Sequence, residues 1–540
     1  MQKIIKLFFL LSLLIPIEVS ASPLDWPEIE TTHRPGAYWH WPGSAVDKGN
    51  LTANMEAMRK AGMGGGTVVA FYGAKGYEDR FIDYLTPEWL DMFNHAAEEA
   101  ERLGMWIDLT PGTAWPFGGP MVTEEMKDAR AIYKNGRLSL EFSGRYVKRA
   151  APGGVGYALN PFSPEAMSIY LKHFDAAFDA HENLRMPRAF YHDSFEYNGN
   201  WSPGLIEAFE EFRGYDLEPF LPLLFGSEQS EKVARIKSDY RETLSDLHYG
   251  YVKTWDDWAQ SRGATTRNQA HGATANLLDL YAASGIPETE TFGATPFGIP
   301  GVRYDPAHVS DMGPPQPLIN RMASSAAHVT GKPLVASETV TWIRNHFRAS
   351  LAMAKPEIDQ LFLNGINHIF FHGTCYSPED VPWPGWLFYA PFQYNSRNSI
   401  WRDAPALNAY IARCQSILQS GKPDNDIALY WPIYDIWHDP TEMEQMLTVH
   451  HTEWFENSEF GKTAARLHER GFGFDYISDR QLSKGLGKKY PTVLVPRTQH
   501  MPLETMKSLL KLEKEGVTVL YIDGMPQTVP GFHRWEEREA

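Results

Sequence analysis

Three short apolar segments of the chain end at, or close to, a glutamate. They are RAFYHDSFE, which ends at Glu196, SGIPETETFG, which holds Glu288 and Glu290, and PLVASETVTW, which holds Glu338. Runs of this kind are typical of buried strands, and parallel α/β barrels carry their catalytic groups at the C-terminal ends of such strands. Two carboxyl groups that face each other across a cleft suit acid/base hydrolysis of a glycosidic bond.

The residues around Glu196 predict a partly desolvated carboxyl group. Tyr191, Phe195, Tyr197 and Trp201 are its neighbours in the sequence. Removal from water raises the pKa of a carboxyl group, which suits a general acid. The alternative is a structural glutamate in a salt bridge to a neighbouring loop.

Glu338 and Asp193 are further acidic candidates. Glu338 follows the small residues Ala336 and Ser337 and has no basic neighbour in sequence, so we expect it to face the cleft. Pairing with an Arg or Lys of an adjacent strand is its alternative. In a regular strand Asp193 would point away from Glu196, but strand ends often break this alternation. Asp193 therefore stays a candidate for substrate contact.

Glu288 and Glu290 alternate along one strand and should share a face. Two carboxylates on one face repel each other unless a shared proton or a cation lies between them. A hard cation such as calcium takes carboxylate oxygens readily. We expect one of the two to be a metal ligand; the alternative is that one of them caps the following loop.

Histidines and tryptophans recur where strands are expected to end. The histidines are His40, His192, His271 and His372. They can bond sugar hydroxyls, and no HExxH pair points to a transition metal. Trp41 and Trp342 offer flat apolar faces on which a sugar ring can stack. For both residue types, packing within the core or the loops is the structural alternative.

Eight strand candidates alternate with helical patterns. The strands are expected at 37–41, 66–72, 105–111, 188–196, 265–272, 286–293, 333–340 and 368–373, and the helices at 51–62, 86–104, 163–178, 231–263, 320–331 and 355–365. Alternation of this kind means parallel pairing, and eight units predict a (β/α)8 barrel, a TIM barrel, over residues 22–422. An open doubly wound sheet is the second choice. Long loops at 112–163 and 374–403 should enlarge the top face of the barrel.

A second unit is expected over residues 423–540. Strand patterns at 426–432, 474–478, 492–497 and 516–523 alternate with helical patterns at 451–471 and 503–516. This predicts a partial doubly wound α/β domain, because the chain stops soon after a strand and so resembles a truncated unit.

Bulk composition narrows the function classes. The formal net charge of −17 disfavours nucleic acid and anionic membranes as partners. Lys3 and Lys6, an apolar run and the small residues before position 22 predict a signal peptide over residues 1–21, with a membrane anchor as the alternative. We therefore expect an exported protein, periplasmic or secreted, with no membrane association after cleavage. Two cysteines exclude a four-cysteine zinc site.

The longer motifs resemble glycoside hydrolase family 106, the α-L-rhamnosidases. The matching stretches are RPGAYWHWPGSAVDKGNLTANMEAMRKAGMGG, HDSFEYNGNWSPGLIEAFEEFRGYD, NLLDLYAASGIPETETFG, SSAAHVTGKPLVASETVTW and GINHIFFHG, within residues 33–430. The resemblance implies a barrel, an inverting mechanism and a calcium ion near the bound rhamnose. By position, Glu196 resembles the general acid and Glu338 the general base of the family. Glu290 or Glu288 resembles a third acidic residue, assigned to calcium or to base duty. The chain departs from the family pattern in being shorter.

Together these observations predict an inverting, calcium-assisted α-L-rhamnosidase that acts on plant or microbial polysaccharides or glycosides. Inversion requires carboxyl groups roughly 6.5–9.5 Å apart, so that a water molecule fits between them and the sugar. His40, Trp41, Asp193, His271, Trp342 and His372 are the expected substrate contacts. The alternatives are a retaining exo-glycosidase of another sugar on the same barrel, and a truncated sugar-binding protein without turnover.

Overall fold

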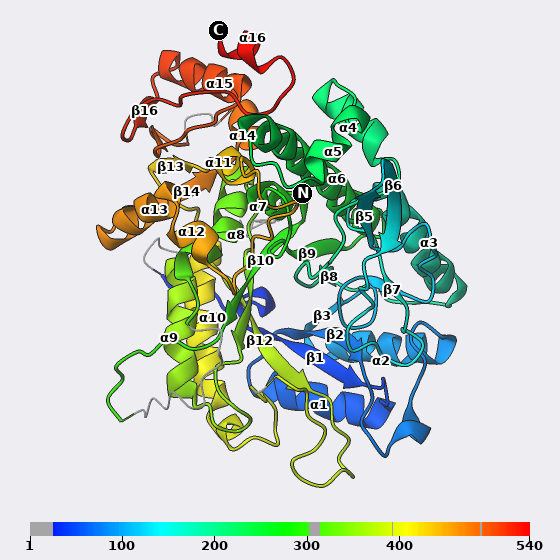
Figure 1. Ribbon diagram of the computed structural model, residues 1–540. Helices are drawn as coiled ribbons and strands as arrows, with labels where there is room; N and C mark the ends of the chain where they lie inside the picture. Colours follow the sequence, from blue (N-terminus) through cyan, green and yellow to red (C-terminus); the bar gives the residue numbers. More distant parts are fainter. Residues whose placement is uncertain (1–24, 302–313, 391, 486–488) are drawn as a thin grey trace, which may run out of the picture.

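Eight parallel strands close into a barrel in the computed structural model, which describes residues 25–301, 314–390, 392–485 and 489–540 (Figure 1). The strands are β1 (Gly36–Pro42), β2 (Gly65–Phe71), β3 (Trp106–Leu109), β8 (Ala189–His192), β9 (Thr265–Gln269), β10 (Ile286–Phe292), β11 (Ala336–Thr341) and β12 (His368–Cys375). Each neighbours the next barrel strand in the chain, and β12 closes the ring against β1. The predicted (β/α)8 fold is confirmed, and the expected signal peptide lies outside the described residues.

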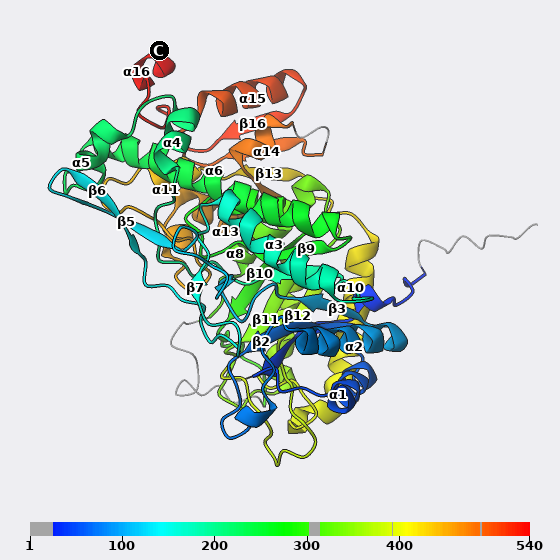
Figure 2. The same cartoon turned by 90° about the vertical axis from the view of Figure 1, so that its right-hand side faces the viewer.

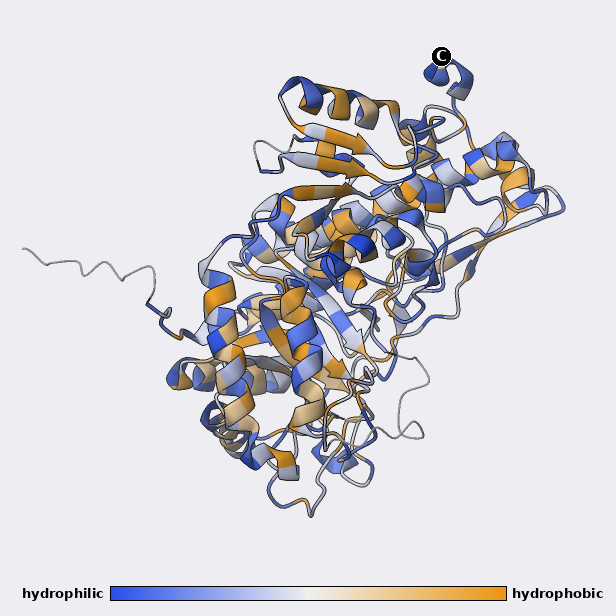
Figure 3. Ribbon diagram, turned by 90° about the vertical axis from the view of Figure 1, so that its left-hand side faces the viewer, coloured by the Kyte–Doolittle hydropathy of each residue, from blue (hydrophilic) through white to orange (hydrophobic). Residues whose placement is uncertain are grey.

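Helices cover the outside of the barrel. They are α1 (Lys48–Lys60), α2 (Pro87–Leu103), α3 (Pro164–Ala180), α6 (Glu231–Ser261), α7 (Leu277–Ala283), α8 (Pro317–Thr330), α9 (Leu351–Leu363) and α10 (Ala404–Ser420). Local chemistry sets the ends of α2: the Thr86 hydroxyl accepts from Trp89 N, and Gly104 ends the helix in the left-handed conformation. Blue and orange residues alternate along these helices in Figure 3, as expected for helices with one buried face. The sequence patterns missed α7.

The alternation of strand side chains decides which residues reach the barrel interior. In β1, Tyr38 and His40 point inward, whereas Trp39 and Trp41 belong to the apolar layer between the strands and the helices. The interior also holds an ion pair between Arg267 of β9 and Glu288 of β10, both without exposed surface. The inward-facing side chains of the strands thus form a charged layer inside the barrel. The layer above it, at the C-terminal ends of the strands, can face solvent.

The long loop after β3 forms a small β excursion. It contains β4 (Gly118–Gly119), β5 (Ala129–Lys134), β6 (Arg137–Phe142) and β7 (Tyr157–Ala158), with β5 and β6 as an antiparallel hairpin. The loop after β8 carries α4 (Leu205–Arg213) and α5 (Leu221–Leu224). Figure 2 shows the hairpin extending alongside α4 to α6, away from the barrel strands.

The C-terminal unit is a four-stranded parallel sheet with the order β14-β13-β15-β16. Its elements are β13 (Ile427–Tyr430), α11 (Ile433–Trp437), α12 (Glu453–Glu456), α13 (Glu459–Glu469), β14 (Phe474–Ile477), α14 (Asp479–Ser483), β15 (Thr492–Val495), α15 (Leu503–Lys514), β16 (Thr518–Tyr521) and α16 (Trp535–Glu539). The sheet packs on the barrel through α8, which contacts β14. No helix in the described residues is long and apolar enough to cross a membrane.

Candidate active site

A pocket lies at the C-terminal ends of the barrel strands. Seven of the residues expected from the sequence line it: Asp193, Glu196, Glu290, Glu338, His40, His372 and Trp342. The structure therefore gathers acidic residues that are up to 145 positions apart (193 to 338) into one place. The strand-end arrangement of a parallel barrel explains why they meet.

Glu338 of β11 is held by a dense set of polar contacts. Thr341 Oγ1 donates to its Oε1 over 2.6 Å, and Gln269 Nε2 donates to its Oε2 over 2.9 Å. His372 Nδ1 lies 3.5 Å from Oε1. Burial, together with the nearby charges of Glu290 and Asp193, raises the pKa of Glu338 well above its ordinary value.

Glu290 and Asp193 complete a buried acidic cluster. Burial, followed by the charge of Asp193, raises the pKa of Glu290 to about 8. Burial raises the pKa of Asp193 to about 6. Because neighbouring carboxylates repel each other, the cluster favours the protonated form of at least one of its members. The cluster thus contains more carboxyl groups than positively charged groups.

Glu288 lies below this cluster and does not line the pocket. Its Oε2 pairs with Arg267, and its Oε1 accepts from the Tyr38 hydroxyl and from Gln269 Nε2. Both oxygens are engaged and the charge is balanced inside the barrel. Of the two expected metal ligands, the structure therefore leaves only Glu290 placed to hold a cation in the pocket.

Glu196 has a different environment from the one expected. β8 ends at His192, so Glu196 lies on an extended loop beyond the strand. Its side chain is 34% exposed, forms an ion pair with Lys148 through Oε2, and accepts a 3.2 Å hydrogen bond from Trp115 Nε1. Its sequence neighbours Phe195 and Tyr197 line a separate pocket on the other side of the loop. The carboxyl group is partly withdrawn from solvent, but these two neighbours face away from it, and its contacts are those of the salt-bridge alternative.

Lys148 belongs to the insertion after β3, and no sequence pattern marked it as a site residue. Burial, aided by Arg145 and Arg149, lowers the pKa of Lys148 to about 8. The ion pair with Glu196 and the proximity of Asp193 favour its charged form. A cation thus lies beside the carboxyl group that was expected to be the proton donor.

Two expected substrate contacts lie elsewhere. Trp41 has no exposed surface and packs against Trp39 and Trp89 beneath the helices, because its neighbour His40 takes the inward position. His271 is buried behind the cluster, with Nε2 3.1 Å from Glu290 Oε2. It can orient Glu290, but it does not line the pocket.

Other residues of the pocket came from long loops. Trp115 follows β3, Tyr389 follows β12, and His450 comes from the segment before α12, with Nε2 3.7 Å from Glu290 Oε2. The guanidinium of Arg149 lies 3.5 Å from the centre of the Tyr389 ring. The aromatic richness of the loop at 374–403 was a usable signal for Tyr389, whereas no pattern marked His450.

The arrangement provides two carboxyl groups in one cavity, Glu338 on β11 and Glu196 on the loop after β8. Glu196 is accessible to solvent and can exchange its proton, while Glu338 is buried and fixed by hydrogen bonds. The cavity between the side chains measures about 50 Å³, which is room for one or two water molecules. A larger substrate must therefore displace side chains at the rim as it enters.

Comparisons with known proteins identify the family and the fold. A family model described as alpha-L-rhamnosidase matches residues 28–135 and 132–538. The fold resembles a rhamnosidase from Novosphingobium sp. PP1Y, with a TM-score of 0.74 at 17% identity over 95% of this chain and 71% of the other. It also resembles a β-galactosidase from Bacillus circulans, with a TM-score of 0.59 at 14% identity over 91% and 71%. A Formosa agariphila protein named provisionally as a β-glucuronidase is 22% identical over 93% of this chain, which spans about half (49%) of that relative.

Proposed function

Because the chain belongs to glycoside hydrolase family 106, the family described as α-L-rhamnosidase, we propose that it hydrolyses terminal α-L-rhamnosyl residues with inversion. The substrates would be rhamnose-containing plant or microbial polysaccharides or glycosides. The observation that carries the proposal is that Glu196 and Glu338 line one pocket from the ends of different barrel strands. Two such carboxyl groups are the minimum that glycosidic hydrolysis requires.

In this mechanism Glu196 donates a proton to the leaving oxygen. Its partial exposure lets it recover a proton from solvent, and Trp115 Nε1 fixes one of its oxygens. Lys148 opposes the protonated form, because a neighbouring cation favours the carboxylate. Departure of Lys148 from Glu196 when substrate enters would therefore switch the acid on.

Glu338 would deprotonate the attacking water. Gln269 donates to one of its oxygens and Thr341 to the other, which leaves a lone pair on each oxygen for water. To act as a base it must be ionised, although burial and the charges of Glu290 and Asp193 raise its pKa. A positive charge bound in the cluster would favour the loss of a proton from Glu338.

The acidic cluster fits a calcium ion in its chemistry. Calcium prefers carboxylate oxygens, and the buried Glu290 and half-buried Asp193 offer them, while the nearby cation Lys148 is already paired with Glu196. We propose that these two residues would hold the ion, whereas Glu288 is committed to Arg267. Bound there, calcium would supply a Lewis acid for sugar hydroxyls and a charge that keeps Glu338 ionised.

The roles are tested with aryl α-L-rhamnosides whose leaving groups differ in basicity. Glu196→Gln should lose activity on poor leaving groups and keep much of it on an activated one, because an activated group departs without a proton. Glu338→Gln should lose activity on both kinds of leaving group, by a factor on the order of 10² or more. The raised pKa of Glu338 favours one rival assignment, in which Glu338 is the acid, and that rival predicts the opposite pattern.

Stereochemistry and location need separate measurements. NMR of the first-formed product distinguishes inversion from retention, and a retained anomer would favour a retaining exo-glycosidase on this barrel. We further propose export to the periplasm or the medium, based on residues 1–21. N-terminal sequencing of the mature protein should then begin near residue 22.

A further inference from the structure

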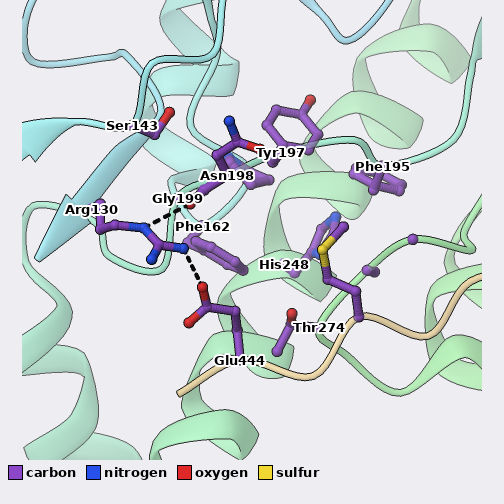
Figure 4. Close-up of a pocket in the computed structure, with 14 residues that line it drawn as sticks. Arg130, Ser143, Phe162, Phe195, Tyr197, Asn198, Gly199, His248, Thr274 and Glu444 are labelled. Carbon is purple, nitrogen blue, oxygen red and sulfur yellow. Dashed lines mark hydrogen bonds and ion pairs between the residues drawn. The ribbon is translucent and has the colours of Figure 1, made fainter. Parts of the chain in front are cut away.

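A second and larger cavity lies behind the loop that carries Glu196. It measures about 280 Å³, near the lower end of the range of roughly 300–1,000 Å³ that is usual for small-molecule sites. Its walls come from β5, the loop after β8, α6, the turn after β9 and the segment before α12. Figure 4 shows these walls converging, with Arg130 joined to Glu444 and His248 facing them.

The loop after β8 is a wall common to both pockets. Asp193, Ser194 and Glu196 face the active site, whereas Phe195 and Tyr197 face the second cavity. This alternation is that of an extended segment, whose successive side chains point to opposite sides. A molecule in the second cavity would therefore press on the backbone that positions Glu196.

His248 makes this cavity unusual. The side chain is 1% exposed, and neither ring nitrogen has a hydrogen-bond partner among the described residues. Burial lowers its pKa to about 3, so the ring is neutral and offers one donor and one acceptor. Buried polar atoms in proteins are nearly always paired, so a ligand with adjacent hydroxyl groups would fit this edge.

The charge balance of the cavity argues against an ionic ligand. Arg130 is paired with Glu444 and donates through Nε to Asn198 O over 3.1 Å. The other groups that line the cavity are uncharged, and they include the aromatic rings of Phe162 and Phe195. A neutral molecule with one apolar face and several hydroxyls matches this lining. A pyranose has that character.

We propose that the cavity behind the Glu196 loop is a second carbohydrate site that binds one neutral sugar ring. This extends the proposed glycosidase function. The ring can come from a distal residue of the glycan substrate or from free monosaccharide in solution, because both present the same hydroxyls. In either case occupancy is coupled to the active site through the shared loop.

The experiment uses two variants that spare the catalytic residues. His248→Phe keeps the ring and removes both nitrogens, and Met446→Trp narrows the cavity from a side chain that is 45% exposed. Met525→Trp, at an exposed methionine of the C-terminal unit, is the matched control. Calorimetry and saturation-transfer NMR measure the binding of L-rhamnose, D-glucose and D-galactose, with inorganic phosphate as the anionic arm.

Both variants should weaken the binding of at least one sugar by about tenfold, whereas the control should not. Sugar binding that is unchanged in both variants, or phosphate competing for the same site, would overturn the proposal. Kinetics identify the source of the sugar. If the variants raise KM only for oligosaccharides, the cavity binds a distal residue of the substrate. If they change only the binding of monosaccharides, the cavity binds free sugar.

Failure of the proposed rhamnosidase function can be distinguished from failure of the second sugar site. Hydrolysis of an aryl α-L-rhamnoside should change by no more than about twofold in the His248→Phe and Met446→Trp variants. If the unmodified chain hydrolyses no rhamnoside but shows sugar binding that depends on His248, the rhamnosidase proposal falls and the second site stands. If it hydrolyses rhamnosides but the variants bind sugars normally, the second site falls alone.

Discussion

Replacing Lys148 by methionine tests the electrostatics of the proposed acid. Methionine keeps the length of the side chain and removes its charge, so Glu196 loses a cation and little packing. Without that cation, the Glu196 carboxyl group should hold its proton to higher pH. Because a general acid works only while protonated, the alkaline limb of the kcat/KM profile should move upward.

The magnitude follows from the contact between the two groups. Unit charges about 4 Å apart interact by about 1 kcal/mol in water and about 4 kcal/mol at an effective dielectric constant near 20. Both side chains are 34% exposed, which places the pair toward the weak end of that range. We therefore expect about 1.4 kcal/mol, which corresponds to an upward shift of about one pH unit.

The assay is the pH dependence of kcat/KM on an aryl α-L-rhamnoside at low and high ionic strength. The shift between wild type and Lys148→Met should shrink at high salt, because exposed charges are screened. Lys127→Met is the control: Lys127 lies in the same insertion, pairs with Glu124, and does not line the pocket. An alkaline limb that stays in place in Lys148→Met would refute either the role of Glu196 as the acid or the influence of Lys148 on it.

Two further variants test the buried acids. The pKa of Glu290, raised to about 8, means that its contribution to stability is present at low pH and is lost as the pH rises from its ordinary value of 4.5 through 8. Glu290→Gln should therefore raise Tm, in the presence of chelator, by more at pH 8 than at pH 4; equal shifts at the two pH values would contradict this. Arg267→Met leaves Glu288 buried without its cation and should reduce the free energy of unfolding by about 3–5 kcal/mol. Adding Glu288→Gln should recover much of that loss in denaturant titrations, and no recovery would show that Arg267 acts through packing alone.

The barrel was predictable because its strands follow one simple rule. Parallel strands buried on both faces give short apolar runs, and all eight were found with shifts of a few residues at their ends. The helix α7 was missed because its polar and apolar residues do not give a clear stripe when read alone. Its burial comes from packing against α8, which is a tertiary effect.

The site was predictable only where a strand positions the residue. Glu338 and Glu290 lie within β11 and β10, and the alternation of side chains placed them correctly in the pocket. The same alternation, applied to His40 and Trp41, should have excluded Trp41, since adjacent residues of one strand cannot both face inward. Glu196 was found by position, but its contacts could not be foreseen because they come from a loop more than 40 residues away in sequence.

Parts of the chain outside the barrel contribute further titratable groups to the site. The strands supply the acids, whereas Lys148 comes from the insertion after β3 and His450 from the segment that precedes α12. That segment is tied to the barrel by two backbone hydrogen bonds, from Gly272 N to Leu447 O over 2.8 Å and from Leu447 N to Ala273 O over 3.1 Å. Any movement of the C-terminal unit that pulls on these bonds would displace His450 from Glu290 and deform the second cavity at the same time. The barrel fixes where the carboxyl groups lie, and its attachments bring Lys148 to Glu196 and His450 to Glu290.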